Sequence, residues 1–251
     1  MTTWVDSHCH VHGEEDVDAQ LARARTAGVA WLVCVGTDLP ASQQALDVAA
    51  RHEDVRATVG LHPHDASKLA AEWEMLEALA ATGECVGIGE AGFDLYYEHS
   101  PRDEQEIAFR AQIRLAGELG KALVVHTRDA WNDTFRVLSD AGVPERTVFH
   151  CFTGGPDEAR RALELGCYLS FSGIVSFKRA DDLRAAARLV PDDRLLVETD
   201  SPYLAPEPFR GTPNEPAHVT VVGAALAAAR GVGPDAIAAI TRRNAATVFA
   251  S

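Results

Sequence analysis

Eight short apolar segments, separated by stretches of helical character, restrict the fold of this chain more than any other feature. They cover residues 3–9, 30–36, 55–61, 85–89, 122–125, 147–149, 168–171 and 195–197. Apolar runs without regular alternation are typical of parallel strands that are covered on both faces. Strands that alternate with helices indicate parallel βαβ units, and eight units in about 250 residues favour a closed (β/α)8 TIM barrel. An open doubly wound sheet is the alternative that the pattern leaves open.

The intervening stretches carry start and stop signals for helices. The longest helix is expected over residues 100–119, because Ser100 suits the N-cap, Pro101 suits the first helical position and Gly120 suits the end. Further helices are expected over residues 16–27, 40–51, 69–81, 129–141, 156–165, 180–189, 219–229 and 235–249. Neither an internal repeat nor an interdomain linker interrupts the pattern. The sequence therefore predicts one domain over residues 1–251, with the proline-rich segment 201–216 as a loop at the rim of the active site.

The composition excludes some classes of surface and location. With 23 Lys and Arg against 37 Asp and Glu, the formal net charge is −14, which argues against a broad basic surface for nucleic acid. A local phosphate site stays possible, since bound divalent metal ions carry their own positive charge. Five cysteines without a Cys-x-x-Cys pair indicate free thiols in a reducing compartment. Without a signal-peptide pattern or an apolar run of about 20 residues, the sequence predicts a cytoplasmic protein with no membrane contact.

Polar residues at the ends of the apolar segments carry the chemical signal. On a strand, residues two apart point to the same side, so His8 and His10 present two imidazoles to one cavity. Glu90 comes directly after the segment 85–89, and a carboxylate there is costly unless a partner stabilises it. Because histidines follow several other segments, the expected partner is a metal ion. Gly87 and Gly89 are expected to leave space beneath it.

The other candidates have ordinary explanations when each is taken alone. His126 and His150 suit a buried core, and Asp200 suits a turn cap. A barrel changes this interpretation, because the carboxyl ends of all its strands meet at one face. The set that meets there is His8, His10, Glu90, His126, His150 and Asp200. Six ligands suit two ions that share a carboxylate, and Glu90, midway along the strand order, is predicted to bridge them.

Seven short motifs, in this order and spacing, resemble those of one enzyme family. They are Asp6-Ser-His-Cys-His10, Gly60-Leu-His-Pro-His64, Gly89-Glu-Ala-Gly-Phe-Asp94, His126-Thr-Arg-Asp-Ala130, His150-Cys-Phe-Thr-Gly154, Glu198-Thr-Asp-Ser-Pro202 and Asn214-Glu-Pro216. The series resembles the TatD family of metal-dependent deoxyribonucleases, within the amidohydrolase-type barrels, from about residue 4 to the segment 244–249. Ala91, Phe93 and Thr127 depart from the usual residues of the family, and none of them is a predicted ligand.

This resemblance implies a (β/α)8 barrel, a two-metal centre and hydrolysis of DNA phosphodiester bonds. It assigns one ion to His8, His10 and Asp200, the other to His126 and His150, and places Glu90 between them. Ligation rich in imidazole favours Zn, Mn, Co or Ni over Mg, although Mg can serve through its availability in the cell.

Further residues are expected to assist the reaction. Asp200 is predicted to accept the proton of the attacking water, and with Glu90 it is predicted to be catalytic. His62 is expected to contact a substrate phosphate, with a turn-stabilising role as the alternative. Arg128 is expected to clamp a phosphate, with a salt bridge to Asp129 or to the helix that follows as the alternative.

The expected function is therefore exonuclease-type cleavage of DNA, at a single strand or near a strand end. The rival enzyme hypothesis is hydrolysis of an ester or amide, such as an aminoacyl-tRNA ester, by the same kind of centre. The rival without catalysis is a metal-holding scaffold. The oligomeric state is left open, and a monomer is compatible with the sequence.

Overall fold

Eight parallel strands form a barrel in this protein. A computed structural model describes residues 2–13 and 16–250. Each strand is hydrogen-bonded to the next along the chain, in the order β1 to β8, and all pairs are parallel. The strands are β1 (Trp4–Cys9), β2 (Val29–Val35), β3 (Val55–Val59), β4 (Cys85–Asp94), β5 (Ala122–Arg128), β6 (Thr147–Phe149), β7 (Tyr168–Phe171) and β8 (Leu195–Val197). The predicted (β/α)8 barrel is confirmed, and the open sheet is excluded.

The barrel closes where β1 meets the segment after β8. Cys9 forms a parallel bridge with Ser201, and the Asp200 N–H donates to the carbonyl oxygen of His8 at 2.9 Å. The N–H of His10 likewise donates to the carbonyl oxygen of Ser201 at 2.7 Å. This closure brings the first and last predicted metal ligands side by side, although about 190 residues separate them in the chain.

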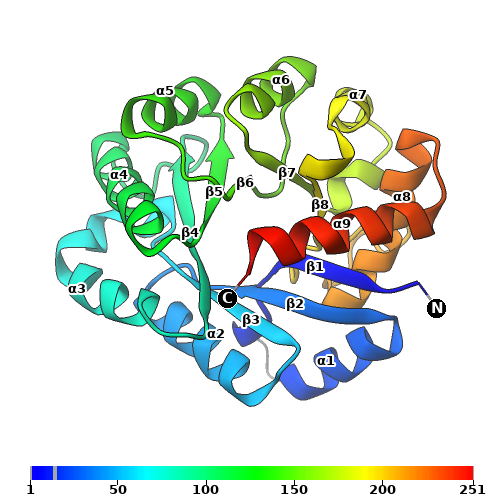
Figure 1. The fold of residues 1–251 in the computed structure, drawn as a ribbon, viewed down its shortest axis with the longest axis horizontal. Coiled ribbons are helices and arrows are strands. Elements are labelled where there is room, and N and C mark those ends of the chain that lie inside the picture. Colours follow the sequence, from blue (N-terminus) through cyan, green and yellow to red (C-terminus); the bar gives the residue numbers. More distant parts are fainter. Residues whose placement is uncertain (1, 14–15, 251) are drawn as a thin grey trace.

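Helices surround the barrel, as Figure 1 shows. They are α1 (Val17–Thr26), α2 (Leu39–Arg51), α3 (Leu69–Ala80), α4 (Arg102–Leu119), α5 (Trp131–Ala141), α6 (Pro156–Glu164), α7 (Asp181–Leu189), α8 (Val219–Arg230) and α9 (Pro234–Val248). The predicted helices are confirmed to within two residues at each end. Ser100 is not the N-cap of α4, which begins after Pro101. Its hydroxyl instead donates to the carbonyl oxygen of His64.

The last helix closes one end of the barrel. In Figure 1, α9 (red) crosses in front of the strands. Val248 and the following Phe249 are fully buried among inward-facing valines, such as Val5, Val33 and Val124. Because apolar side chains fill this end, the polar residues that follow the strands are collected at the opposite end.

Two strands run further than predicted. β4 continues past Glu90 to Asp94, and β5 continues past His126 to Arg128. Between Ile88 and Ala91 the register of β4 against β5 shifts, and after this shift the two strands pair again. The prediction ended each strand at its first polar residue, because a buried charge is costly. Here each polar residue has a partner on the neighbouring strand, so pairing continues.

Gly89 allows the strands to approach each other closely. Its φ is +139°, and a Cβ atom there would lie 2.5 Å from the carbonyl oxygen of Val124 in β5. The expectation that Gly89 leaves space beneath a metal pair is therefore wrong, because a neighbouring strand takes that space. At Gly87, likewise, a Cβ atom would meet Thr58 and Ala122.

All five cysteines carry free thiols. In the part of the chain that the structure describes, no single helix has the length and apolar composition to cross a membrane. Residues 216–230 and 234–248 meet that criterion only as a pair, with a bend of 110° between them.

Candidate metal centre

A cavity of about 990 Å³ lies at the carboxyl ends of the strands. Its lining includes residues within or directly after β1, β3, β4, β5, β6 and β8, namely His10, His62, Glu90, His126, His150 and Asp200. His8 is fully buried and lies against this set. The structure therefore brings all six predicted ligands together, and their role as ligands stays a prediction.

Four donor atoms form a compact group on one side of Glu90. His8 Nε2 lies 3.3 Å from His10 Nε2, 3.4 Å from Glu90 Oε2 and 3.7 Å from Asp200 Oδ1. His10 Nε2 lies 3.7 Å from Glu90 Oε2 and 3.6 Å from Asp200 Oδ1. Ligands about 2.0 to 2.2 Å from a tetrahedral ion such as zinc stand about 3.3 to 3.6 Å from one another. Three of these five distances lie within that range and the other two, at 3.7 Å, are slightly longer, so these residues fit a divalent metal ion.

The orientation of His10 supports ligation. Its Nδ1 lies 3.0 Å from the carbonyl oxygen of Val35, which fixes the ring and turns Nε2 toward the donor group. A histidine ligand commonly donates its second N–H to a carbonyl oxygen in this way. Burial, together with the charge of His150, lowers the pKa of His8. A neutral imidazole keeps the lone pair that a metal ion needs.

A second donor group faces the other oxygen of Glu90. Glu90 Oε1 lies 2.7 Å from His126 Nδ1, 2.7 Å from His150 Nε2 and 3.6 Å from His62 Nε2. The two ring nitrogens of His126 and His150 are 3.2 Å apart. The two carboxylate oxygens of Glu90 thus serve two different groups of nitrogens, which is the arrangement of a bridging carboxylate.

The surroundings keep Glu90 ionised. Burial alone would raise its pKa, but the charge of His150 and the hydrogen bonds from His126 and His150 hold the pKa well below the usual value. For His150, burial is outweighed by Glu90 and Glu198, which raise its pKa well above the usual value. An ionised carboxylate among imidazoles can bind a cation once the competing protons leave.

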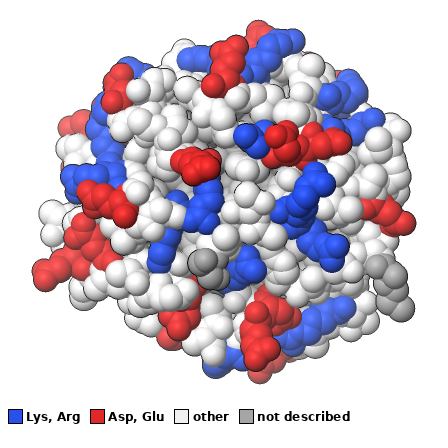
Figure 2. All heavy atoms as spheres, in the orientation of Figure 1, with Lys and Arg blue, Asp and Glu red and all other residues white. Residues whose placement is uncertain are grey.

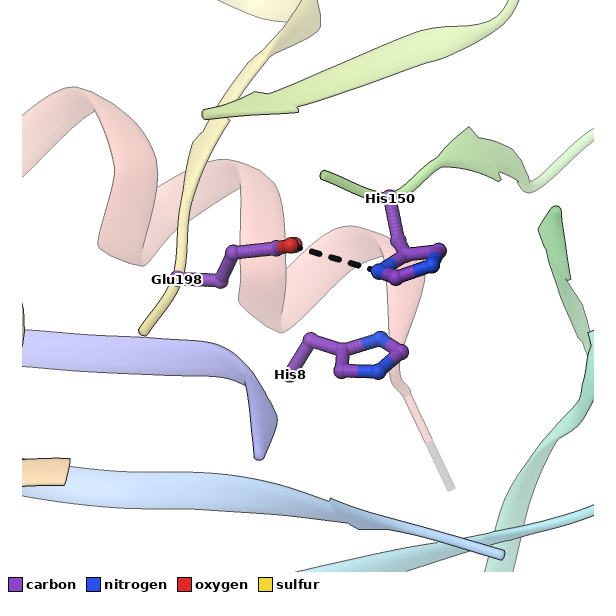
Figure 3. Close-up of side chains that lie close together, drawn as sticks. All are labelled: His8, His150 and Glu198. Carbon is purple, nitrogen blue, oxygen red and sulfur yellow. Dashed lines mark hydrogen bonds and ion pairs between the residues drawn. The ribbon is translucent and has the colours of Figure 1, made fainter. Parts of the chain in front are cut away.

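Glu198 is a residue that the sequence interpretation missed. Its Oε1 accepts from the N–H of Cys151 at 2.7 Å and lies 3.3 Å from His150 Nδ1. Figure 3 shows this carboxylate aimed at His150, whose ring stacks on His8 at 3.9 Å between centroids. Glu198 precedes Asp200 by two residues, and the same rule that paired His8 with His10 would have indicated it. Among the described residues, neither Glu198 Oε2 nor His8 Nδ1 has a hydrogen-bond partner.

Asp94 connects the second donor group to the rim. Its Oδ2 lies 2.9 Å from His64 Nε2 and 3.5 Å from His126 Nε2. Its Oδ1 accepts from the N–H groups of Tyr96 and Tyr97 at 3.0 and 2.9 Å. Burial alone would raise the pKa of Asp94, but hydrogen bonds from His126, the Tyr97 N–H and His64 lower it. This carboxylate fixes the loop beyond Glu90.

The two predicted substrate contacts lie in the cavity wall. His62 Nδ1 accepts from the His64 N–H at 3.1 Å, so this histidine stabilises its turn while Nε2 faces Glu90. Arg128 is exposed, and its guanidinium lies over the rings of Tyr96 and Tyr97. Among the residues that the structure describes, Arg128 forms no salt bridge with Asp129 or with α5, and its guanidinium rests on the two tyrosine rings instead.

Asn214 secures the proline-rich loop beside the cavity. Its Nδ2 donates to the carbonyl oxygens of Thr199 and Tyr203 at 2.9 and 2.7 Å, and its Oδ1 lies 2.9 Å from His218 Nδ1. Replacing Asn214 by Ala leaves buried carbonyl groups unpaired, so we expect the free energy of unfolding to fall by about 2–3 kcal/mol. Urea denaturation measures this change. The exposed Asn132→Ala, as control, should change it by less than about 0.5 kcal/mol, and equal effects of the two substitutions would contradict the role of Asn214.

Known proteins resemble this chain over nearly its whole length. The model of the family described as TatD related DNase matches residues 5–250. The metal-dependent hydrolase YcfH of Escherichia coli K12 is 42% identical over 252 residues, which cover 98% of this chain and 95% of YcfH. The 3'-5' ssDNA/RNA exonuclease TatD of Cronobacter sakazakii is 40% identical over 244 residues, covering 94% and 92% of the two chains. The crystal structure of YjjV, a TatD homologue from E. coli K12, superposes with a TM-score of 0.92 at 28% identity, over 99% of this chain and 98% of YjjV.

Proposed function

The chain belongs to the family of TatD related DNases, which are metal-dependent hydrolases, and we propose that it hydrolyses phosphodiester bonds of single-stranded nucleic acid. The observation that carries the proposal is the position of Glu90. Its two carboxylate oxygens face two separate groups of imidazole nitrogens, 3.4 Å from His8 and 2.7 Å from His150. Such a carboxylate suits two divalent ions, and two-metal sites are common in enzymes that cleave phosphodiesters.

The residues divide into two sets of ligands around Glu90. His8, His10 and Asp200 would hold one ion, His126 and His150 would hold the other, and Glu90 would be shared between them. When bound, such ions supply Lewis acidity toward a phosphate oxygen and lower the pKa of water toward neutrality. Imidazole-rich ligation favours Zn, Mn, Co or Ni, and Mg is the alternative when it is more available.

Asp200 is the proposed acceptor of the proton from the attacking water. Burial alone would raise its pKa, yet the imidazoles of His10 and His150 hold that pKa below the usual value. The carboxylate is therefore ionised at neutral pH and free to take a proton. It lies beside Glu90 at the cavity wall, within 4 Å of both His8 and His10.

Two further side chains, His62 and Arg128, are placed to contact a phosphate of the substrate. His62 presents Nε2 next to Glu90, and burial lowers the pKa of His62 well below its usual value, so the ring is neutral. A neutral ring can donate a hydrogen bond to a phosphate oxygen. Arg128 supplies a fixed positive charge at the rim, where it can pair with a phosphate as charge develops on the nonbridging oxygens.

The substrate is proposed to be a single strand, entered near its end. The relative from Cronobacter sakazakii is named a 3'-5' exonuclease for ssDNA and RNA, and it is 40% identical to this chain. The surface is not built for long duplex contacts, since the net charge is −14. Figure 2 shows the opposite end of the barrel, which α9 covers, and acidic and basic side chains are interspersed there without a wide area of one sign. We therefore expect contact with a few nucleotides.

Digestion of end-labelled strands tests the proposal. With Mn²⁺ or Mg²⁺, single-stranded DNA and RNA labelled at the 5' or the 3' end should be shortened progressively, while blunt duplex DNA should be a poor substrate. An excess of chelator should stop the reaction. Hydrolysis of an aminoacyl ester or a small amide without cleavage of any oligonucleotide would instead support the rival enzyme hypothesis. A chain that cleaves none of these substrates with either metal would support the scaffold.

A further inference from the structure

Two adjacent tyrosines project from the rim of the cavity. Tyr96 and Tyr97 follow β4, and 58% and 51% of their surfaces are exposed. Their rings are perpendicular to each other, with centroids 4.8 Å apart. The guanidinium carbon of Arg128 lies 4.2 Å from the ring centroid of Tyr96 and 4.7 Å from that of Tyr97. Together the three residues form an exposed surface of flat groups, which we call the rim platform.

Hydrogen bonds to Asp94 and strand pairing between β4 and β5 link the rim platform to the metal centre. Asp94 accepts from both tyrosine N–H groups and also contacts His126 at 3.5 Å. Arg128 follows His126 by two residues on β5, where it pairs in register with Asp94 of β4. Arg128 therefore stands on the same pair of strands as Glu90 and His126, and Asp94 at the end of β4 ties the turn of the two tyrosines to them, so the barrel fixes the distance between the platform and these donors.

The charge of Arg128 is available for a ligand. No carboxylate within the described ranges forms an ion pair with it, and the residue is exposed. An arginine that rests on aromatic rings is held in one orientation while its N–H groups stay free to bind a phosphate. Both Tyr97 and Arg128 line the same cavity as Glu90.

We propose that the rim platform binds an unpaired nucleobase and its phosphate, next to the bond that is cleaved. This inference rests on the proposed function and names how the same site recognises its substrate. An unpaired base has two open faces that stack on tyrosine rings or on a guanidinium plane, and its own phosphate complements the charge of Arg128. In a duplex both base faces are covered by neighbouring pairs. The platform therefore favours single strands and frayed ends over paired DNA.

A crossed comparison of enzyme variants and substrates tests the platform. The substrates are a labelled oligothymidylate and a set of the same strands, each with one abasic residue at positions one to four from the attacked end. The enzymes, all loaded with Mn²⁺, are the wild type, Tyr97→Leu, Tyr97→Phe and the control Ile107→Ala. Ile107 is equally exposed, at 59%, but lies on α4 outside the cavity lining. Thermal unfolding of each variant verifies its fold.

The wild type and the control should show a rise in KM of about fivefold or more at one abasic position, which is the range for loss of one stacked base. Tyr97→Leu should show a similar rise on the intact strand and no further rise on the abasic strand, with little change in kcat. Tyr97→Phe, which keeps the ring, should restore the difference between the two strands.

Two different outcomes distinguish failure of the rim platform from failure of the proposed nuclease function. If Tyr97→Leu keeps the wild-type KM, or the full abasic penalty, then the rim platform does not bind the base, even though the nuclease function stands. If the wild type cleaves no oligonucleotide at all, the proposed function itself fails.

Discussion

Replacing Glu90 by Gln is expected to lower kcat/KM for nucleic acid by about a thousandfold or more, with the barrel intact. The carboxylate has one oxygen near His8 and the other near His126 and His150. Glutamine keeps the shape of the side chain, but it offers one neutral oxygen and one NH2 group. An NH2 group cannot bind a cation, and the lost negative charge weakens the binding of both ions.

The matched control for this substitution is Glu84→Gln. Glu84 is an exposed acid in the turn before β4, so its replacement changes the net charge equally and should leave the rate unchanged. The measurements are kcat/KM at saturating Mn²⁺ and the metal content of each purified variant. A Glu90→Gln enzyme that keeps the wild-type rate with saturating metal would refute the bridging role.

Removal of metal is expected to have an effect of similar size. Dialysis against a strong chelator should abolish hydrolysis, because Lewis acidity is lost together with the lowered pKa of water. Activity should return with added Mn²⁺ and reach its plateau near two equivalents, since the ligands form two groups around Glu90. The apo chain should also unfold at a lower temperature, because ions bind the folded chain and are released on unfolding.

The Mn²⁺ titration distinguishes a two-ion centre from a single-ion centre and from activity without metal. A plateau at one equivalent would indicate a single ion, and full activity in the presence of chelator would exclude metal dependence. Calcium is the matched control, since it prefers six to eight oxygen ligands at longer distances than an imidazole-rich site provides. Calcium should restore far less activity than Mn²⁺.

The fold was predictable because burial imposes a simple pattern. The apolar runs from residue 30 to 36 and from 122 to 125 lie where β2 and β5 are found. The predicted strand ends were wrong where contacts between residues far apart in the sequence stabilise a polar residue inside a strand. β4 continues past Glu90 because His126 and His150, 36 and 60 residues away, stabilise the buried acid. No local window of sequence contains that pairing.

The site was predictable only in part for the same reason. The topology of a barrel brings the six candidate ligands to one end, so their convergence followed once the fold was assumed. Glu198 was missed although strand alternation indicates it, since it reads as one more acid beside Asp200. The rim platform was missed because exposed tyrosines in a loop carry no signal until Asp94 and Arg128 are seen to hold them.

Anomalous diffraction from crystals grown with Mn²⁺ is the decisive test of a two-ion centre at Glu90, because it locates the ions themselves. We expect two anomalous peaks about 3.5–4 Å apart, one on each side of the Glu90 carboxylate. One peak should lie among His8, His10 and Asp200, and the other beside His126 and His150. A single peak, or two peaks that do not share Glu90 as a ligand, would rule out a two-ion centre bridged by this carboxylate.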